Sequence, residues 1–570
     1  MRASRVRRGL TAVATALATA ATATAATAGA APQAPPEPAT ADVRLITFND
    51  LHGNLEPPTG SSGEIELDDG GTVEAGGAAY LAAHLERLRA EVPNSLVFSA
   101  GDSVGASPVN SALFHDEPTI DFLNSQDVRA HVAGNHEFDE GYQELWRMAT
   151  GGCHPQDGCE FRDSFAGADF PYLGSNVTFE GGAPALLPFT VQLSGGVPIG
   201  VIGATLHDLP SSVSPGAVRG LEFGDEVEAI DRTADALDRI GVKAQVVLLH
   251  QGDEAESGGP NSCDVAPGGP AHRIAAAVTP KVDALFTAHS HQQYTCTVPD
   301  PAGAPRPVLQ GASYGRLLSV LDLRVDRASG EVVRQGSRAR NEVVTRDIAP
   351  DPEAAALVEE AREKAAPIAN RAVGTTAGDL LREPAPSGES SMGSVIADAQ
   401  LESTADAGAQ VALTNPGGVR ADLPHASSPA GEGDGVVTYG EAFAVQPFGN
   451  TMQTITLTGA QLKGVLEQQW TPEGATILQV SAGLHYAWSE SAPIGSKVSG
   501  LTLHGEPVVP DAPYRVAVNN FLAGGGDGFT GFLEGTDVTG GKLDLDALLD
   551  YFAAHPGVVP PSADRIEVQG

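Results

Sequence analysis

VRLITFNDLHG, residues 43–53, is the first of five stretches in which an apolar run ends in acidic, amide or imidazole side chains. The others are SLVFSAGDS (95–103), RAHVAGNHEFD (129–139), AQVVLLHQGD (244–253) and VDALFTAHSH (282–291). Short apolar runs of this kind predict buried β-strands. Because ligands of open α/β sheets bind beyond the carboxyl ends of the strands, we expect the five polar tips to converge.

The tips offer seven ligands for metal ions, all of them carboxylate, amide or imidazole groups without a thiolate. Such a set suits Zn, Mn, Fe or Co. Seven ligands are too many for one tetrahedral ion but fit two ions that share a bridging carboxylate, for which Asp102 is the candidate. Two such ions activate water and hold a phosphoryl group for in-line attack. The predicted ligands are Asp50, His52, Asp102, Asn135, His250, His289 and His291.

His136 and Asp139 lie three residues apart in GNHEFD, at the rim of the same predicted site. A histidine held by a carboxylate can stay protonated, and it can then stabilise negative charge or protonate a leaving oxygen. We therefore predict that they form a catalytic pair. The alternative interpretation makes His136 another metal ligand and Asp139 a helix cap.

The chain has 570 residues and a formal net charge of −38. This length favours two large domains, and the alternation of short apolar runs with helix-forming stretches predicts α/β layers. The acidic surface argues against nucleic-acid polymers and anionic lipid as partners. An anionic substrate would need a local positive site. We predict a first domain over 41–345, a connecting helix over 346–373 and a smaller α/β domain over 374–570.

The first residues predict export. Arg2, Arg5, Arg7 and Arg8 precede an uncharged small and apolar run, so residues 1–30 are predicted to be a signal peptide and 31–40 a Pro-rich linker. No later apolar stretch is long enough to span a membrane, so we expect a secreted protein without an anchor. Of the three possible cysteine pairings, the simplest joins Cys153 to Cys159 and Cys263 to Cys296. The alternative is a thiolate metal site.

These motifs resemble a known family. ITFNDLHGN, FSAGDSVGASP, GNHEFDEG, LLHQGD and AHSHQ are similar to the calcineurin-like metallophosphoesterase domain of 5'-nucleotidases. NPGGVR, VQPFGN and NNFLAGGGDGF resemble the carboxy-terminal substrate domain of the same family. The resemblance implies an α/β fold in which a four-layer first domain, with two β-sheets flanked by helices, is joined by a helix to a smaller substrate domain. It also implies that two divalent ions (Zn, Mn, Co or Fe/Zn) are bound, with Asp102 shared between them.

By this resemblance, Asp50, His52, Asp102 and His291 would hold one ion, and Asp102, Asn135, His250 and His289 the other. Phe448 and Phe521 would sandwich the nucleobase, and Asp527 would accept from the ribose hydroxyls. Stacking of this kind tolerates every base. Two departures stand out: the chain offers only Arg382 where the family usually has an arginine pair, and Pro416 where glycine is common. The implied substrate-binding residues are Arg382, Asn415, Gly418, Arg420, Phe448, Phe521 and Asp527.

We therefore expect a secreted 5'-nucleotidase that converts small nucleotides to nucleoside and phosphate by in-line attack of a hydroxide shared by the two metals. One alternative is another enzyme on the same scaffold, a 2',3'-cyclic nucleotide phosphodiesterase or a UDP-sugar hydrolase. A second alternative, of a different class, is an exported nucleotide-binding protein without catalytic activity. The base preference, the number of phosphates and the oligomeric state stay open.

Overall fold

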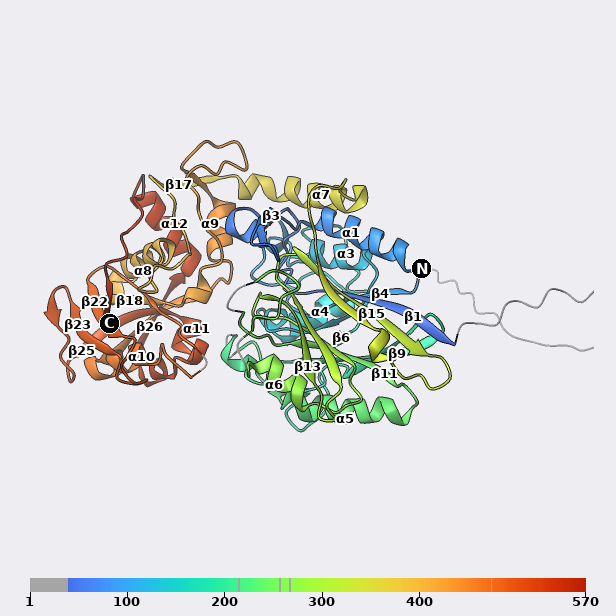
Figure 1. Cartoon of the computed structure of the whole chain (residues 1–570). Coiled ribbons are helices and arrows are strands. Elements are labelled where there is room, and N and C mark those ends of the chain that lie inside the picture. The colour runs from blue at the N-terminus through green and yellow to red at the C-terminus, as the bar shows by residue number, and fades with distance from the viewer. Residues whose placement is uncertain (1–38, 214–215, 256–257, 266–267, 473, 570) are drawn as a thin grey trace, which may run out of the picture. The chain divides into compact units, whose positions relative to one another are not determined.

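The computed structural model describes residues 39–569 except 214–215, 256–257, 266–267 and 473 (Figure 1). The predicted signal peptide and nearly all of the predicted Pro-rich linker lie outside the described residues. By their contacts, the residues from Thr40 onward group into one compact unit.

All five apolar stretches form β-strands, as predicted. Strands β1, β4 and β5 are parallel neighbours in a six-stranded sheet of order β16-β15-β1-β4-β5-β6. Strands β11 and β12 are parallel neighbours in a second sheet of order β13-β14-β12-β11-β9-β8. The bounds are β1 (Thr40–Phe48), β4 (Ser95–Ser99), β5 (Val128–Val132), β6 (Tyr172–Leu173), β8 (Phe189–Ser194), β9 (Val197–Thr205), β11 (Ala244–His250), β12 (Ala284–Thr287), β13 (Gln293–Pro299), β14 (Pro305–Gly311), β15 (Leu317–Asp326) and β16 (Arg338–Val343).

The two sheets pack against each other through one face each. Val43 and Leu45 of β1 share a buried cluster with Val201 of β9 and Val246 of β11. The alternate β1 residues Ile46 and Phe48 face the other way, where they pack with helices α1, α3 and α7. Helices α5 and α6 cover the outer face of the second sheet. The bounds are α1 (Ala78–Glu91), α3 (Glu117–Ser125), α5 (Glu226–Arg239), α6 (Pro270–Ala277) and α7 (Pro352–Ala369).

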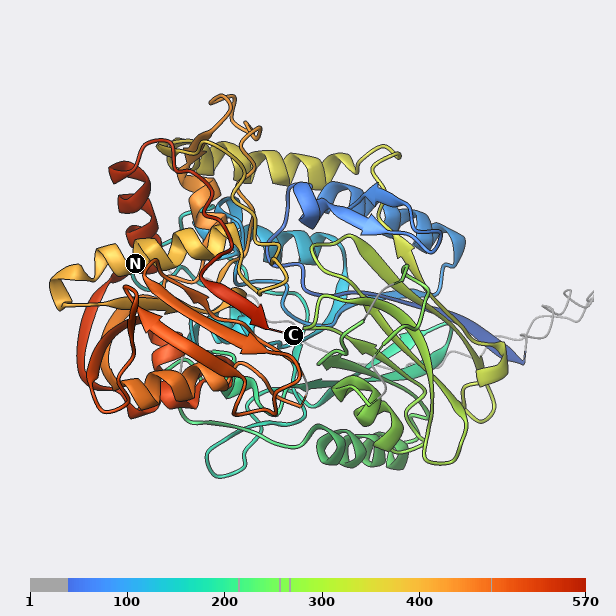
Figure 2. The ribbon, with the colours of Figure 1, turned by 60° about the vertical axis from the view of Figure 1, so that its left-hand side comes forward.

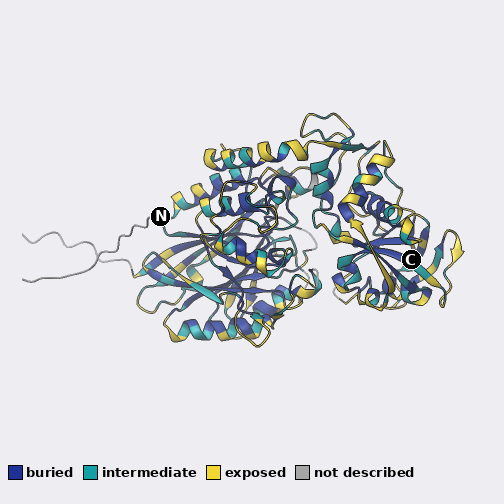
Figure 3. Cartoon of the chain, turned by 180° about the vertical axis from the view of Figure 1, so that it is seen from behind, coloured by how far each residue is buried: buried dark blue, intermediate teal, exposed yellow. Residues whose placement is uncertain are grey.

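The first domain is therefore a helix–sheet–sheet–helix stack, which is the predicted four-layer α/β arrangement. Because both faces of each central strand are covered, the strands read as nearly continuous apolar runs. The burial colours show this directly, since the strands are mostly buried whereas the outer helices carry exposed residues (Figure 3).

Helix α7 lies within the predicted connecting segment. Its N-cap is Asp351, whose side chain accepts a hydrogen bond from the backbone N–H of Ala354. The helix is shorter than the predicted span of 346–373. It ends at Ala369, and β17 (Ala372–Thr375) follows. Pro367 lacks the amide hydrogen that its turn needs, and the residues after the helix instead pair with β19 (Val436–Thr438).

The carboxy-terminal part forms its own sheets. Within the described residues, no strand that precedes α7 pairs with a strand that follows it. The larger sheet has the order β21-β18-β25-β20-β26 and the smaller one β24-β23-β22-β27. The bounds are β18 (Val411–Thr414), β20 (Thr451–Thr458), β21 (Gln479–Val480), β22 (Leu484–Ser489), β23 (Val498–Leu503), β24 (Glu506–Pro507), β25 (Pro513–Asn519), β26 (Thr536–Leu543) and β27 (Ile566–Gln569).

Helices cover both faces of the larger sheet. Leu413 of β18 and Val516 of β25 pack with α10 (Gly459–Glu467), whereas the alternate residues Ala412 and Ala517 form a separate cluster on the side of α8 (Ser391–Ser403). The same layering, with strands between helices, is visible from a second direction (Figure 2). This part is therefore the predicted smaller α/β domain.

The cysteines form the two predicted disulfides, Cys153–Cys159 and Cys263–Cys296. No cysteine is left to supply a thiolate to a metal ion, so the alternative interpretation is wrong. Across the helices that the structure describes, none combines the length and the apolar character needed to cross a bilayer.

Candidate metal centre and substrate pocket

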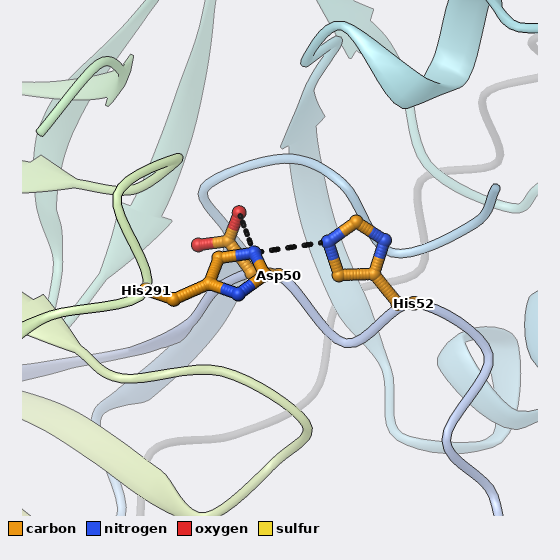
Figure 4. Close-up of side chains that lie close together, drawn as sticks. All are labelled: Asp50, His52 and His291. Atoms are coloured by element: carbon orange, nitrogen blue, oxygen red, sulfur yellow. Dashed lines mark hydrogen bonds and ion pairs between the residues drawn. The ribbon is translucent and has the colours of Figure 1, made fainter. Parts of the chain in front are cut away.

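The structure brings the seven predicted ligands together at the carboxyl ends of strands from both sheets. Asp50, His52 and His291 form a first group, whose ligand atoms all lie within 4.8 Å of one another (Figure 4). In this group, Nε2 of His291 lies 3.2 Å from Nε2 of His52 and 3.6 Å from Oδ1 of Asp50. These three side chains come from segments about 240 residues apart in the chain, with a separation of 239 between His52 and His291.

Asp102, His250 and His289 form a second group within the same limit of 4.8 Å. Oδ2 of Asp102 lies 3.1 Å from Nε2 of His250, and Oδ1 of Asn135 lies 3.0 Å from Nδ1 of His289. The same Asp102 oxygen is 3.9 Å from Nε2 of His52 in the first group. Asp102 therefore lies between the two groups, where a bridging ligand is expected.

The two carboxylates of the centre are buried, with 0% of Asp50 and 1% of Asp102 exposed. Burial raises the pKa of Asp50 to about 7, because a carboxylate loses its solvation there. Asp102 behaves differently: burial raises its pKa, but the surrounding histidines outweigh that effect and hold the pKa well below its usual range. Buried carboxylates require compensating positive charge, which bound cations would supply.

His250 provides the sharpest test of whether a metal ion fits. Its Nδ1 lies 2.9 Å from the carbonyl oxygen of Ala100 and donates to it, so Nε2 of the neutral ring presents a lone pair. This buried Nε2 has no hydrogen-bond partner, although it faces the carboxylate of Asp102. A cation between the two atoms would satisfy both lone pairs. Without one, burial lowers the pKa of His250 but Asp102 outweighs burial and raises it to about 9.

The ligand loops have an unusual backbone conformation. Five of the predicted ligands adopt positive φ angles: Asp50 (49°), His52 (47°), Asp102 (50°), His289 (72°) and His291 (58°). This left-handed region costs a non-glycine residue roughly 1–2 kcal/mol. It turns the chain sharply, so ligands two positions apart, such as Asp50 and His52, belong to the same group. Strain of this kind persists at sites where neighbouring structure enforces it.

Backbone hydrogen bonds between neighbouring loops enforce these turns. The N–H groups of Asp50 and His52 donate to the carbonyl oxygens of Gly101 and Asp102, at 2.9 and 3.0 Å. The carbonyl oxygen of Asp50 accepts from the N–H of Tyr314 at 2.7 Å. The loop after β1 is therefore held on both sides.

His136 and Asp139 form the predicted hydrogen-bonded pair. Nδ1 of His136 lies 2.7 Å from Oδ2 of Asp139, and the backbone N–H of His136 donates to Oδ1 of Asp102 at 2.9 Å. Burial lowers the pKa of His136, but Asp139 and Asp102 outweigh burial and raise it overall. His136 also groups with His52 and Asp102 as a possible ligand, so the alternative interpretation stays open.

The aromatic residues predicted to bind the base lie at the same pocket. Phe448 stacks on the imidazole of His136, with ring centroids 5.5 Å apart and an interplanar angle of 14°. Nδ2 of Asn415 donates to Oδ2 of Asp527 at 2.8 Å. The ring of Phe521 lies against Gly526. A pocket of about 260 Å³ is lined by Asn135, His136, Asp139, His289, Asn415, Gly418, Arg420, Phe448, Phe521 and Asp527, among others.

The two arginines have different places. Arg420 lines this pocket, its guanidinium carbon lies 5.6 Å from the centre of the Phe448 ring, and its buried Nε has no hydrogen-bond partner. Arg382 instead donates through Nη1 to the carbonyl oxygen of Arg420 at 3.0 Å. It lines a neighbouring cavity of about 1630 Å³, together with Arg273, Arg316 and Arg420, which lines both spaces.

Comparison with known proteins agrees with this geometry. Two family models match the chain: calcineurin-like phosphoesterase over residues 43–293, and 5'-nucleotidase, C-terminal domain, over residues 372–534. A cell wall protein of Listeria monocytogenes is 32% identical over 545 residues, which cover 90% of this chain and 67% of that protein. The chain belongs to the 5'-nucleotidase family.

Two further relatives show the breadth of the 5'-nucleotidase family. The endonuclease YhcR of Bacillus subtilis is 31% identical over 518 residues, but the matched region covers 89% of this chain and only 39% of that protein. The crystal structure of a 5'-nucleotidase precursor from Thermus thermophilus superimposes with a TM-score of 0.76 at 28% identity. That match covers 93% of this chain and 99% of the Thermus chain.

Membership in the 5'-nucleotidase family makes the chain a hydrolase of phosphate esters. Calcineurin-like phosphoesterases bind two divalent metal ions, and the two groups of aspartate and histidine side chains are the candidate sites here. The assignment of individual residues to the two ions stays a prediction.

Glu137 is a residue of the site that the sequence pattern did not single out. Its buried carboxylate accepts from the backbone N–H groups of Asp102 (2.9 Å), Ser103 (2.9 Å) and Gly134 (2.7 Å). Burial and the nearby Asp102 raise its pKa to about 8. Glu137 therefore joins the loop that carries Asp102 to the loop that carries Asn135 and His136. The only signal for Glu137 in the sequence is its place as an acidic residue between His136 and Phe138.

Gly134 tests how tightly the centre is packed. A Cβ atom there would lie 2.2 Å from Oδ1 of Asp102 and 2.6 Å from Cε1 of His250. We expect Gly134→Ala to displace both side chains and to lower kcat/KM roughly a hundredfold, together with metal content. Gly464→Ala is the matched control, because a Cβ atom at Gly464 meets no neighbouring atom within 4 Å. Elemental analysis and initial rates measure both effects, and an unchanged rate in Gly134→Ala would contradict the packing argument.

Proposed function

We propose that the chain hydrolyses 5'-nucleotides to nucleoside and phosphate. One observation carries the proposal: a single pocket is lined both by His136 and Asn135, beside the candidate metal groups, and by Phe448 and Phe521. A nucleoside bound between the aromatic rings would present its 5'-phosphate to the metal centre.

The charges around the pocket support an anionic substrate. The chain is strongly acidic overall, with a net charge of −38, so a phosphate is attracted only where positive charge is concentrated. Arg420 supplies a guanidinium in the pocket, and its unpartnered Nε can donate to a ligand. When bound, two divalent ions supply an activated water and neutralise the phosphoryl oxygens.

The remaining chemistry falls to His136. Asp139 accepts from Nδ1 at 2.7 Å, so Nε2 is the ring nitrogen left for the substrate. A protonated His136 can stabilise charge on the ester oxygen as the P–O bond breaks, and it can pass its proton to the departing 5'-oxygen. Asp139 fixes the orientation of the ring and keeps the proton on Nδ1, so that Nε2 is the nitrogen that gives up its proton.

Removal of an aromatic ring tests the proposed base site. Stacking of a base on an aromatic ring contributes about 1–3 kcal/mol, so we expect Phe521→Ala to raise KM for AMP roughly five- to 150-fold. The measurement is steady-state kinetics with AMP and with ribose 5-phosphate, which has the same phosphate ester but no aromatic ring to stack. The KM for ribose 5-phosphate should stay unchanged. Equal increases for both substrates would indicate a general disturbance of the pocket.

The proposed activity itself is tested by chromatographic identification of the products formed from a panel of substrates, because cleavage of a cyclic nucleotide or of UDP-glucose gives a phosphorylated product without free phosphate. The protein is treated with a chelator and reloaded with Mn²⁺ or Zn²⁺, and AMP, ADP, ATP, 2',3'-cyclic AMP and UDP-glucose are compared. We expect phosphate release from AMP that disappears after chelation and returns on reloading. Binding of AMP without phosphate release in either metal would instead support the exported nucleotide-binding protein.

A second candidate function is hydrolysis of a substrate with a group beyond the phosphate, such as a nucleotide sugar. The cavity of about 1630 Å³ favours it, because it adjoins His136 and Asp102 and carries Arg273, Arg316 and Arg382. A larger kcat/KM for UDP-glucose than for AMP in the same panel would favour this candidate.

We also propose that the protein is exported and released. The support is the pair of disulfides, which persist in oxidising compartments, together with the predicted signal peptide. Fractionation of the producing cells, with detection of cleavage near residue 30, tests this proposal. Retention of the full-length chain inside the cell would contradict it.

A further inference from the structure

The loop that carries His289 and His291 is held by one buried side chain, that of Gln310. Gln310 lies near the carboxyl end of β14, the parallel neighbour of β12. Its register partner in β12 is Thr287, the last residue of that strand. The side chain of Gln310 is completely buried, with 0% exposed. The loop that follows β12 therefore begins beside Gln310.

The amide oxygen of Gln310 accepts two hydrogen bonds from this loop. The backbone N–H groups of His291 and Gln292 both donate to it, at 3.1 Å each. The amide nitrogen donates in turn to the hydroxyl oxygen of Tyr294 at 2.8 Å. The reverse orientation of the amide would point its N–H groups at the two backbone N–H donors, so the hydrogen bonds decide the orientation.

Tyr294 gives this contact a fixed base. Its side chain is completely buried, and its hydroxyl lies 2.8 Å from Oγ1 of Thr287 and accepts from the backbone N–H of Asp253 at 3.2 Å. Oγ1 of Thr287 donates to the carbonyl oxygen of Leu309 at 2.9 Å. The amide of Gln310 is therefore attached to the strands of the second sheet and not to a surface group.

The surroundings of the amide are closely packed. A Cβ atom at Gly252 would lie 2.4 Å from Oγ of Ser290 and 2.5 Å from the amide group of Gln310. The space beside the amide therefore does not admit even a methyl group. A buried side chain in such packing is confined to one rotamer, so it can hold the loop in a single position.

His291 depends on this contact more than His289 does. The backbone N–H of His289 donates to both carboxylate oxygens of Asp50, at 3.1 Å each, whereas that of His291 donates to Gln310. Both histidines adopt positive φ angles, which persist where neighbouring groups enforce them. From this turn the imidazole of His291 reaches Asp50 and His52 (Figure 4).

We propose that Gln310 is a positioning residue of the candidate metal centre. It fixes the backbone N–H groups of His291 and Gln292, and it thereby aims the imidazole of His291 into the first metal group. Both ends of its amide are occupied by protein groups, so Gln310 is not itself a ligand. The proposal rests on the candidate metal centre and not on which phosphate ester is cleaved.

Binding of Mn²⁺ alone tests the proposal without any substrate. The full chain is stripped with a chelator and titrated with Mn²⁺, and free Mn²⁺ is counted by electron paramagnetic resonance. We expect two ions per unsubstituted chain. In Gln310→Met one of them should bind roughly 10- to 100-fold more weakly, which is the usual effect of losing a hydrogen-bonding group behind a metal ligand. Methionine has a similar length but offers the two N–H groups only a weak acceptor.

The spectrum of the bound ions is a second readout. Two ions roughly 3.5–4 Å apart are magnetically coupled, whereas a single ion is not. At a Mn²⁺ concentration that fills both sites of the unsubstituted chain, Gln310→Met should show the signal of a single ion. Gln310→Glu retains an acceptor for the two N–H groups, so it should recover the coupled signal.

Gln245→Met is the matched control. Gln245 is likewise completely buried, and its amide donates to the carbonyl oxygens of Ala234 and Val242 at 3.2 and 2.8 Å. It belongs to the same sheet but lies at the amino end of β11. Gln245→Met should therefore keep both Mn²⁺ affinities, although it also removes two buried hydrogen bonds.

The titration can contradict the proposal in three ways. Equal affinities in Gln310→Met and the unsubstituted chain would refute it, and so would an equal loss in Gln245→Met. Fewer than two ions in the unsubstituted chain would overturn the candidate centre and this proposal with it. Hydrolysis of AMP by the unsubstituted chain is measured separately, so a failure of the proposed function would appear there and not in the titration.

Discussion

Replacing Asp102 by asparagine is expected to lower kcat/KM for phosphate release at least about a thousandfold, equivalent to about 4 kcal/mol of transition-state stabilisation. Asp102 lies 3.1 Å from His250 in one candidate metal group and 3.9 Å from His52 in the other. Loss of its charge therefore weakens both ion sites. Asparagine is the appropriate replacement, because it tolerates the left-handed conformation at φ 50° and keeps an oxygen near the N–H of His136.

The experiment measures initial rates and metal content of the same preparations. We expect Asp102→Asn to lose at least one ion per chain under conditions in which the unsubstituted protein keeps both. Asp163→Asn makes the same chemical change at an exposed position and should leave both quantities unchanged. Full activity in Asp102→Asn would show that Asp102 is not the bridge between the two ions.

His136→Gln is expected to lower kcat about 10²- to 10⁴-fold while both metal ions stay bound, since general acid catalysis contributes a factor of this size. Asp139→Asn should have a smaller effect, because His136 would keep its place but lose the carboxylate that accepts from Nδ1 at 2.7 Å. The defect should shrink with p-nitrophenyl phosphate, whose leaving group departs without a proton.

Metal content decides between the two interpretations of His136. If His136→Gln loses an ion, His136 is a metal ligand in the group that it forms with His52 and Asp102. The prediction that His136 and Asp139 form a catalytic pair is then wrong. If the ions stay and the defect is equal for AMP and p-nitrophenyl phosphate, His136 acts on the phosphoryl oxygens rather than on the leaving oxygen. His485→Gln, at an exposed histidine, controls for the loss of one imidazole.

Much of the site could be predicted from the sequence, because its ligands directly follow the strands that carry them. The apolar run of β1 ends at Phe48, and Asp50 and His52 come within four residues of it. A continuous apolar run and the polar residues that follow it are local features of the sequence. They can therefore be recognised without knowing which strands lie next to each other in the sheet. The nearest cysteine pairing was likewise the correct one. The predicted boundaries at residues 345 and 374 stay predictions.

Contacts between distant segments could not be predicted in the same way. The left-handed conformation of Asp50 depends on two hydrogen bonds to other loops: its N–H donates to the carbonyl oxygen of Gly101, and its carbonyl oxygen accepts from the N–H of Tyr314. Glu137 becomes informative only because two loops present their N–H groups to its carboxylate. His115 and Asp157, whose side chains lie 2.9 Å apart, are separated by 42 residues in the chain. Sequence by itself determined the strands, the polar tips and the chemical kind of the ligands, since these follow from local residue order. Only the tertiary structure decided which tips meet, which carboxylate lies between the two groups and which histidines stack, because the packing of the two sheets sets those distances.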